Sequence, residues 1–234
     1  MRAIILAAGM GTRLRPLTYD TPKSLVEVNG KPMLEKQIEF MQEKGINEII
    51  IVTGYLAEKF DYLVDKYNVK LIHNDKYEEY NNLYTMYLVR EYLPGSYVTE
   101  GDVYINRNLF VENLDPNKSL YFSAKKKDFK QEWIIQHDEN RKVSDIIVGD
   151  GDEEFIMCGV SYWSKRDGDI IVKRLEKAVE GGNFQELFWD HMVKDNIQDL
   201  NIYLHEMGVY DSFEIDSLDD LNTVEEILRN LQHI

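Results

Sequence analysis

The feature that most constrains the fold is an alternation of short apolar runs with amphipathic segments in the first hundred residues. The apolar runs cover residues 2–7, 48–53, 69–73 and 96–100. Runs of this length and aliphatic content are typical of strands that are buried on both faces of a sheet. A helical pattern follows from Pro32 and ends before Gly45, a residue type favoured just after a helix, and a second helix is expected at residues 56–67. Strands that alternate with helices predict a doubly wound, parallel α/β fold.

The second half of the chain has a different, strand-rich pattern. Strands are expected at residues 120–124, 133–137, 143–148, 155–163 and 200–206, and helices at 165–180, at 184–195 and from about Ser217. No Gly/Ser linker or low-complexity segment separates the two halves. We therefore expect residues 1–234 to form a single Rossmann-like domain around one mixed, mainly parallel sheet. Residues 1–117 would form its nucleotide-binding half, and residues 118–234 its acceptor-binding half.

Charge and cysteine content narrow the range of partners. The chain has 42 acidic and 27 basic residues, a net charge of −15, which disfavours nucleic-acid binding and tolerates a cationic ligand. No stretch approaches the ~20 apolar residues of a membrane span, so we expect no membrane partner. The single cysteine, Cys158, cannot form an internal disulfide. Together these features predict a cytoplasmic protein.

The strongest functional signal is the segment that follows the first expected strand. It reads LAAGMGTRLRPLTYDTPKSL over residues 6–25. Gly9 and Gly11 allow backbone N–H groups to approach phosphates without obstruction from a Cβ atom. The spacing is not that of a Walker loop, and Leu14 takes the third position of the dinucleotide-binding glycine motif. Two cations in the same loop, Arg13 and Lys23, suit a triphosphate better than they suit a protein core.

This segment resembles the N-terminal signature LxAGxGTRLxPLT…PKxL of the nucleotidyltransferase (pyrophosphorylase) family, whose members have the nucleotide-diphospho-sugar transferase fold. The resemblance implies that a phosphate oxygen attacks the α-phosphorus of a nucleoside triphosphate and releases pyrophosphate. Arg13 would hold the pyrophosphate, Lys23 would neutralise charge at the α-phosphate, and Asp102 would complete the catalytic set. The loop residues expected to bind the nucleotide are Leu6, Ala7, Ala8, Gly9, Gly11, Thr12, Arg13 and Lys23.

The family resemblance also implies a Mg²⁺ cofactor, a hard ion that one or two carboxylates hold while phosphates supply further ligands. Asp102 follows the strand at residues 96–100 and matches the metal aspartate of the family. Asp216 matches a late aspartate that completes the metal site in similar enzymes. Its alternative role is structural, because Asp216 or Ser217 is well placed to cap the last helix.

Over nearly its full length the chain is similar to the choline-phosphate cytidylyltransferases of bacterial cell-surface phosphocholine pathways. The similar segments are KGINEIIIVTGYL, NDKYEEYNNLYTMYLV, EW at 132–133, FWDHMVKDNI at 188–197 and YDSFEIDSLDDL. The resemblance implies CTP and phosphocholine as small-molecule substrates, and CDP-choline and pyrophosphate as products. Asn81, Asn82 and Thr85 carry groups that can read the cytosine edge, or can instead cap the helix that follows.

A trimethylammonium group makes no ordinary hydrogen bond, so proteins bind it with aromatic faces and carboxylates. Trp133 and Trp189 lie in the acceptor half within the similar segments, and Asp190 offers a counter-charge. Tyr80 and Tyr84 flank the expected base site. These five residues are the candidates for acceptor binding.

Three alternatives remain open at this point. The acceptor could be phosphoethanolamine, aminoethylphosphonate, a polyol phosphate or a sugar 1-phosphate. The chain could be a nucleotide-sugar-dependent glycosyltransferase, since Glu100–Asp102 loosely resembles the metal motif of that class, although that class lacks the Arg13/Lys23 loop. It could also be a non-catalytic nucleotide-binding module. The oligomeric state is not indicated.

Overall fold

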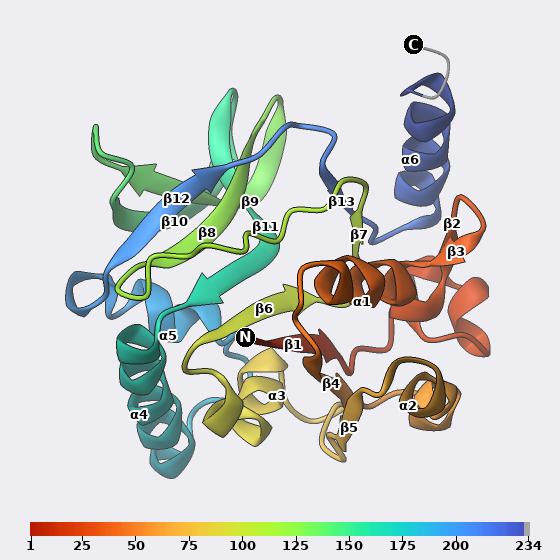
Figure 1. The fold of residues 1–234 in the computed structure, drawn as a ribbon, viewed down its shortest axis with the longest axis horizontal. Helices are drawn as coiled ribbons and strands as arrows, with labels where there is room; N and C mark the ends of the chain where they lie inside the picture. Colours follow the sequence, from red (N-terminus) through yellow and green to blue (C-terminus); the bar gives the residue numbers. More distant parts are fainter. Residues whose placement is uncertain (232–234) are drawn as a thin grey trace.

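The computed structural model describes residues 1–231 (Figure 1). The α-helices are α1 (Met33–Glu43), α2 (Tyr62–Tyr67), α3 (Asn82–Leu88), α4 (Lys165–Gly181), α5 (Asp190–Lys194) and α6 (Leu218–Leu231). The strands of the first half are β1 (Arg2–Ala7), β2 (Glu27–Val28), β3 (Lys31–Pro32), β4 (Glu48–Thr53), β5 (Lys70–His73), β6 (Ser96–Glu100) and β7 (Val103–Ile105). The second half adds β8 (Ser119–Lys126), β9 (Phe129–His137), β10 (Val143–Gly151), β11 (Glu154–Trp163), β12 (Ile202–Glu206) and β13 (Ser212–Glu214).

One nine-stranded sheet runs through both halves of the chain. Its main path is β10-β9-β11-β6-β1-β4-β5, and β8 joins it by pairing with β11 and β12. The strands β6, β1, β4 and β5 are parallel, whereas β11 pairs with β6 in the antiparallel sense. The expected α/β fold with a mixed central sheet is confirmed. The junction of β6 and β11 is where the parallel part meets the antiparallel part.

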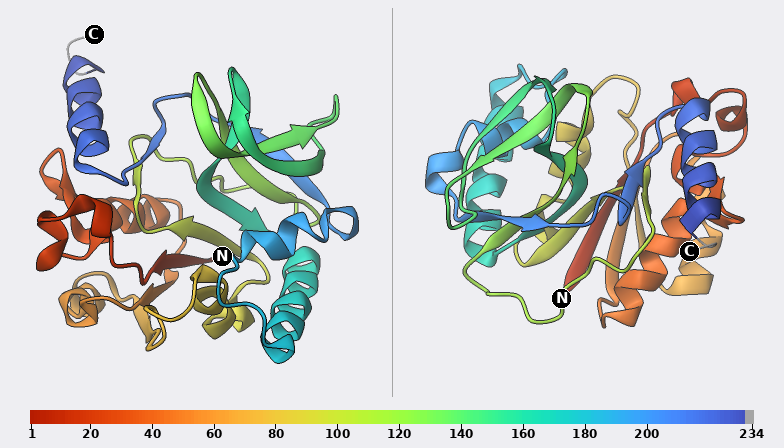
Figure 2. Two further views of the ribbon diagram at one scale, coloured as in Figure 1. Left: turned by 180° about the vertical axis from the view of Figure 1, so that it is seen from behind. Right: turned by 90° about the horizontal axis from the view of Figure 1, so that it is seen from above.

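Helices cover both faces of the parallel part (Figure 2). Along β1, Ile4 and Leu6 point into the core beneath α3 and α4, while Ala3 and Ile5 point into the core beneath α1. Successive strand residues point to opposite faces, so an apolar run without polar interruption is what two buried faces require. The prediction of a buried strand at residues 2–7 is confirmed.

A small separate sheet brings the end of the chain back to the parallel strands. Strand β13 pairs with β7, and the Ile215 N–H donates to the Asp102 carbonyl at 3.1 Å. Because β7 directly follows β6, this pairing places the residues just before α6 beside the carboxyl end of β6. Ligands of open α/β sheets bind beyond such strand ends.

Two of the expected helices are wrong in extent. The pattern at residues 56–67 forms a 3₁₀ turn at Ala57–Phe60 followed by the short α2. The helix expected at residues 184–195 is limited to α5, because the preceding backbone carbonyls bond to another element. The Asn81 N–H donates to Gln185 O at 2.8 Å, and the Leu83 N–H donates to Leu187 O at 3.2 Å.

Gly168 of α4 offers a test of how this helix packs beside the turn that leads into β6. A Cβ atom at Gly168 would lie 2.6 Å from the Pro94 Cα atom, whereas a Cβ at Gly181 of the same helix meets nothing within 4 Å. Gly168→Ala should therefore lower the free energy of unfolding by ~1–3 kcal/mol, and Gly181→Ala should leave it unchanged or slightly raised. Urea unfolding of the two variants measures both values. Equal stability of both would contradict the close contact.

Candidate active site

Two adjoining cavities open at the carboxyl ends of the parallel strands. The smaller, which we call the loop cavity, has a volume of about 190 Å³, and the larger, the aromatic cavity, has a volume of about 660 Å³. Four side chains line both cavities: Lys23, Asn82, Glu100 and Asp102. Two ligands that occupied the two cavities would therefore meet at these four residues.

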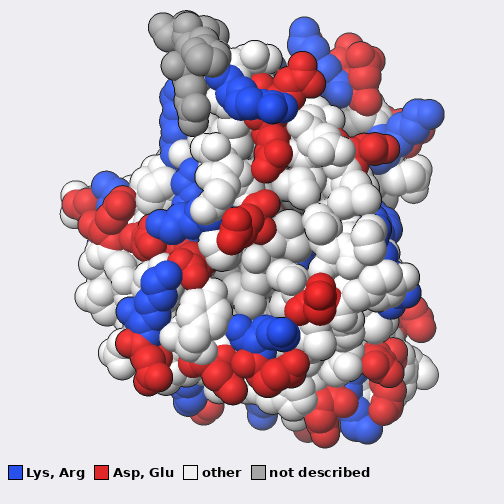
Figure 3. Space-filling view, turned by 90° about the vertical axis from the view of Figure 1, so that its right-hand side faces the viewer, with Lys and Arg blue, Asp and Glu red and all other residues white. Residues whose placement is uncertain are grey.

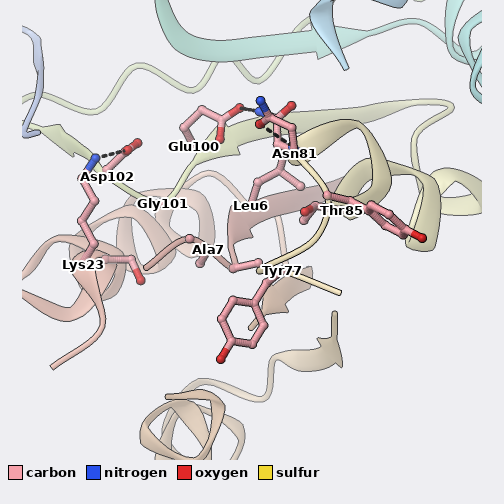
Figure 4. Close-up of a pocket in the computed structure, with 14 residues that line it drawn as sticks. Leu6, Ala7, Lys23, Tyr77, Asn81, Thr85, Glu100, Gly101 and Asp102 are labelled. Carbon is pink, nitrogen blue, oxygen red and sulfur yellow. Dashed lines mark hydrogen bonds and ion pairs between the residues drawn. The ribbon is translucent and has the colours of Figure 1, made fainter. Parts of the chain in front are cut away.

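The loop cavity is built by the end of β1, the start of α3 and the end of β6 (Figure 4). Asp102 and Lys23 lie at one side of it, and Asn81 and Thr85 lie at the other. Its lining contains most of the residues expected to bind a nucleotide, and adds Ser24, Tyr77 and Gly101. The full lining is Leu6, Ala7, Ala8, Gly9, Lys23, Ser24, Tyr77, Tyr80, Asn81, Asn82, Thr85, Glu100, Gly101 and Asp102.

Lys23 is the centre of a charged cluster between the two cavities. Its Nζ atom contacts the Asp102 carboxylate and lies 2.5 Å from Asp216 Oδ1. Burial opposes the charged form, but the two carboxylates outweigh it and raise the pKa of the ammonium above its ordinary value. Gly11 makes this position possible, because a Cβ there would lie 2.7 Å from the Lys23 Cβ atom.

Arg13 reaches the same cluster from the exposed side of the loop. Its Nη2 atom lies 2.7 Å from Asp216 Oδ1, and its side chain is 70% exposed. It lines the aromatic cavity, whereas Arg15 of the same loop lies over the Tyr19 ring instead. Arg13 is thus an exposed cation at the cavity mouth, paired with Asp216, in contrast to the largely buried Lys23.

The alternative reading of Asp216 as a helix cap is resolved by the hydrogen bonds at the start of α6. The Asp220 N–H donates to Ser217 Oγ at 3.2 Å, and the Ser217 N–H donates to Asp220 Oδ2 at 2.8 Å. Ser217 and Asp220 therefore cap α6 reciprocally. The Asp216 carboxylate is left to face Lys23 and Arg13.

Three carboxylates gather closely enough to hold a metal ion. Asp102, Glu214 and Asp216 each offer an oxygen, and these atoms lie within 4.8 Å of one another. Burial, and then the neighbouring charges of Asp102 and Asp216, raise the pKa of Glu214 to about 7. Oxygen donors of this kind suit a hard divalent cation, and a cation is what would relieve the repulsion among the three acids.

The three candidates for reading a base all line the loop cavity, but each already has a partner. Asn81 is the N-cap of α3 and accepts from the Asn82 N–H at 2.7 Å. Thr85 Oγ1 accepts from Asn74 Nδ2 at 3.1 Å. Asn82 Oδ1 accepts from the Trp189 N–H at 2.9 Å. By contrast, the buried Ser24 hydroxyl has no hydrogen-bond partner among residues 1–231, so a bound ligand can satisfy it.

The aromatic cavity brings together the acceptor candidates from the second half of the chain. Trp133 of β9 packs edge-on against Phe188, with ring centroids 6.3 Å apart. Trp189 is only 2% exposed and packs edge-on against Trp163 at 5.6 Å. Trp133, Phe188 and Trp189 all line the cavity, together with Tyr121 and Asp190.

Buried carboxyl groups complete the aromatic cavity. Burial raises the pKa of Asp190 to about 7, although the Tyr121 hydroxyl donates to Asp190 Oδ1 at 2.8 Å and opposes the rise. Burial, followed by the charges of Asp102 and Asp190, raises the pKa of Glu100 well above its ordinary value, and the nearby Trp189 indole opposes this. Removing several acids from water without a cation is costly. The cavity is therefore suited to a positively charged group.

Some candidates are not placed where the sequence suggested. Tyr84 lines neither cavity, because its ring stacks on Tyr87 and Phe184 at 5.9 and 6.0 Å. Gly11 and Thr12 also lie outside the two linings, and Gly11 acts through the position of Lys23. Conversely, sequence reasoning missed Ser24, Tyr77, Tyr121, Phe188 and Glu214. Of these, Ser24, Tyr77, Phe188 and Glu214 lie in segments that had been singled out for other reasons, and only Tyr121 lies outside them.

The face of the molecule drawn in Figure 3 gives no indication of a polyanionic partner. On the face that Figure 3 shows, the basic side chains of the described residues are interspersed with acidic ones and form no continuous basic area. Within residues 1–231, every helix is too short or too polar to cross a membrane.

Comparison with known proteins gives matches over the whole chain. A family model described as nucleotidyl transferase matches residues 2–147. The chain is 51% identical to the choline-phosphate cytidylyltransferase of Streptococcus pneumoniae, covering 98% of this chain and 99% of the relative. It is 34% identical to a 2-aminoethylphosphonate cytidylyltransferase of Lancefieldella rimae, covering 94% and 89%. A solved structure of CTP:phosphocholine cytidylyltransferase from Streptococcus pneumoniae superposes with a TM-score of 0.94 at 51% identity, covering 97% of this chain and 98% of that one.

Proposed function

Because the chain belongs to the nucleotidyl transferase family, we propose that it is a choline-phosphate cytidylyltransferase, which transfers CMP from CTP to phosphocholine and releases pyrophosphate. The observation that carries this proposal is the aromatic cavity, where tryptophan rings and buried acids lie directly beside the Lys23 cluster. The loop cavity, built from residues 6–102, would take CTP, and the aromatic cavity would take phosphocholine. We expect the reaction in the cytoplasm, where CTP is made.

The two loop cations, Arg13 and Lys23, would neutralise most of the phosphate charge. Transfer at phosphorus depends on positioning and charge neutralisation more than on a protein nucleophile. Lys23 lies between the two cavities, which supports a role for its ammonium in neutralising the α-phosphate that would pass between the two substrates. Arg13, exposed at the mouth, would hold the pyrophosphate that leaves.

Asp102 and Asp216 would hold a Mg²⁺ ion, with Glu214 as a third oxygen donor in reach. When bound, the ion supplies positive charge that neutralises phosphate oxygens as charge shifts toward the pyrophosphate. The chain's own carboxylates would hold that charge at the boundary of the two cavities. Lys23, which now contacts both aspartates, would be free to turn to the substrate phosphates.

In the aromatic cavity, the Trp133, Phe188 and Trp189 rings would surround the trimethylammonium group, and Asp190 would supply a counter-charge. A quaternary ammonium needs no hydrogen-bond acceptor, so desolvation costs it less than it costs a primary amine. The phosphate of the acceptor would then extend toward Lys23.

The function is tested by measuring pyrophosphate release with four nucleoside triphosphates and with phosphocholine, phosphoethanolamine, 2-aminoethylphosphonate, a polyol phosphate and a sugar 1-phosphate. We expect the highest kcat/KM for CTP with phosphocholine. A higher kcat/KM for 2-aminoethylphosphonate than for phosphocholine would show that the acceptor is the one named for the Lancefieldella rimae relative. Absence of release with every pair would reject the activity.

Arg13→Ala and Lys23→Ala should each lower kcat by ~10²–10³, because each removes a charge that stabilises the transition state. Arg15→Ala is the matched control, since Arg15 belongs to the same loop but lies over Tyr19. Its kinetics should stay close to wild type. Steady-state assays of the three variants measure the three kcat values. A near-normal kcat for Lys23→Ala would show that this residue has no part in the mechanism.

Asp216→Asn and Asp102→Asn should each weaken Mg²⁺ binding by about tenfold or more, since even outer-shell changes cost ~10–100-fold in affinity. Calorimetric titration with Mg²⁺ measures this directly. Ser217→Ala is the control: it removes the cap of α6 and should lower stability by ~1 kcal/mol while sparing metal affinity. The role of Asp216 is refuted if Asp216→Asn binds Mg²⁺ as wild type does.

The raised pKa of Asp190 predicts a pH dependence of acceptor binding. Its carboxyl is neutral below its pKa of about 7 and charged above it, so attraction for a cation is lost as the pH falls through this value. The KM for phosphocholine should rise up to ~10-fold between about pH 8 and pH 6. In Asp190→Asn the KM should be high throughout, leaving only the titration of the substrate itself. Identical pH profiles for both proteins would contradict the role of Asp190.

A further inference from the structure

The segment from Phe184 to Trp189 is attached to the start of α3 by a series of contacts. The Asn81 N–H donates to Gln185 O at 2.8 Å, and the Leu83 N–H donates to Leu187 O at 3.2 Å. Phe184 packs against the Tyr80 ring at 5.0 Å. The series ends where the Trp189 N–H donates to Asn82 Oδ1 at 2.9 Å. Although about a hundred residues separate the two elements, they form one unit.

The two elements belong to different cavities. Residues 80–82 and Thr85 line the loop cavity, whereas residues 188–190 line the aromatic cavity. Asn82 lines both. Any change at Asn82 can therefore reach the aromatic cavity through Trp189 without passing through the sheet.

The orientation of the Asn82 amide is set by its two contacts. Its oxygen faces the Trp189 N–H, and its nitrogen faces Glu100 Oε1 at 3.5 Å. The first contact is the shorter and the more important. Trp189 precedes α5, which has only five residues and so depends on outside partners to keep its position. The Trp189 indole N–H lies near Glu100 but makes no hydrogen bond of ordinary geometry within residues 1–231.

We propose that Asn82 is a positioning residue for acceptor binding: it holds the Trp189 backbone, and through it Phe188 and Asp190, at the wall of the aromatic cavity. This proposal rests on the proposed function, because it takes the aromatic cavity as the phosphocholine site. It replaces the expectation that the Asn82 amide reads the cytosine edge. The nucleotide is then read by other groups of the loop cavity.

Two variants separate positioning from base reading. Asn82→Ala removes the acceptor for the Trp189 N–H, and the KM for phosphocholine should rise ~10-fold while the KM for CTP changes little. Asn82→Asp keeps an oxygen for the Trp189 N–H but removes the amide donor, so it should restore most of the phosphocholine KM. Gln185→Ala is the matched control: it removes an exposed amide from the same segment but keeps the backbone bond to Asn81.

A raised KM for phosphocholine in Asn82→Ala, rescued in Asn82→Asp and absent in Gln185→Ala, supports the proposal. A raised KM for CTP in both Asn82 variants, with phosphocholine unaffected, overturns it in favour of base reading, and unchanged constants in Asn82→Ala overturn it as well. If Asn82→Ala does not fold, Asn82→Asp alone decides, because a base reader loses the preference for CTP over UTP there, whereas the added carboxyl beside Glu100 weakens both nucleotides alike. The acceptor panel measured with the wild-type protein tests the proposed function separately. If the wild type prefers another phosphorylated acceptor, the proposed function fails, and the KM values of the Asn82 and Gln185 variants are then compared for that acceptor.

Discussion

The contact of Lys23 with Asp102 and Asp216 is the interaction on which the arrangement of the site depends. It joins the loop after β1 to the end of β6 and to the segment before α6. Asp102 and Asp216 follow Lys23 by 79 and 193 residues in the sequence. Without a cation, these acids and Glu214 would repel one another at the edge of the sheet. The lysine therefore keeps these carboxylates assembled, and under the proposed function the same charge would be available to a substrate phosphate. One side chain would then serve both the assembly of the site and its chemistry.

The parts of the molecule that were predictable are those whose signal is local. An apolar run such as residues 2–7 fits only a strand with two buried faces, and the structure places Ile4 and Ile5 in opposite cores. The positions of Arg13 and Lys23 follow from the spacing of a loop that leaves such a strand. The helix expected at residues 184–195 failed because a tertiary interaction overrides its periodicity: the carbonyls of Gln185 and Leu187 bond to α3 rather than to their own segment.

The proposed acceptor site was less predictable because its residues look like core residues in sequence. Tyr121 lies in the apolar run of β8, and only the fold shows that its hydroxyl turns to Asp190. Trp133 and Trp189 are equivalent by sequence, yet Trp133 is partly exposed and Trp189 is packed on Trp163. Asp216 and Ser217 could not be separated either, since both stand before a helix. The hydrogen bonds of Asp220 separate them.

The charge of the aromatic cavity explains how one site can favour a permanent cation. Asp190 and Glu100 are buried with raised pKa values, so near neutral pH the protein resists placing two negative charges there. A quaternary ammonium, which cannot lose a proton, shifts this balance toward the charged acids by its own field. A primary ammonium would do the same, and the acids that line the cavity could also accept its hydrogen bonds, so only the aromatic rings favour a methylated head over a primary one. Under the proposed function, discrimination between the two would therefore come from the aromatic rings, and the strength of attraction from the acids.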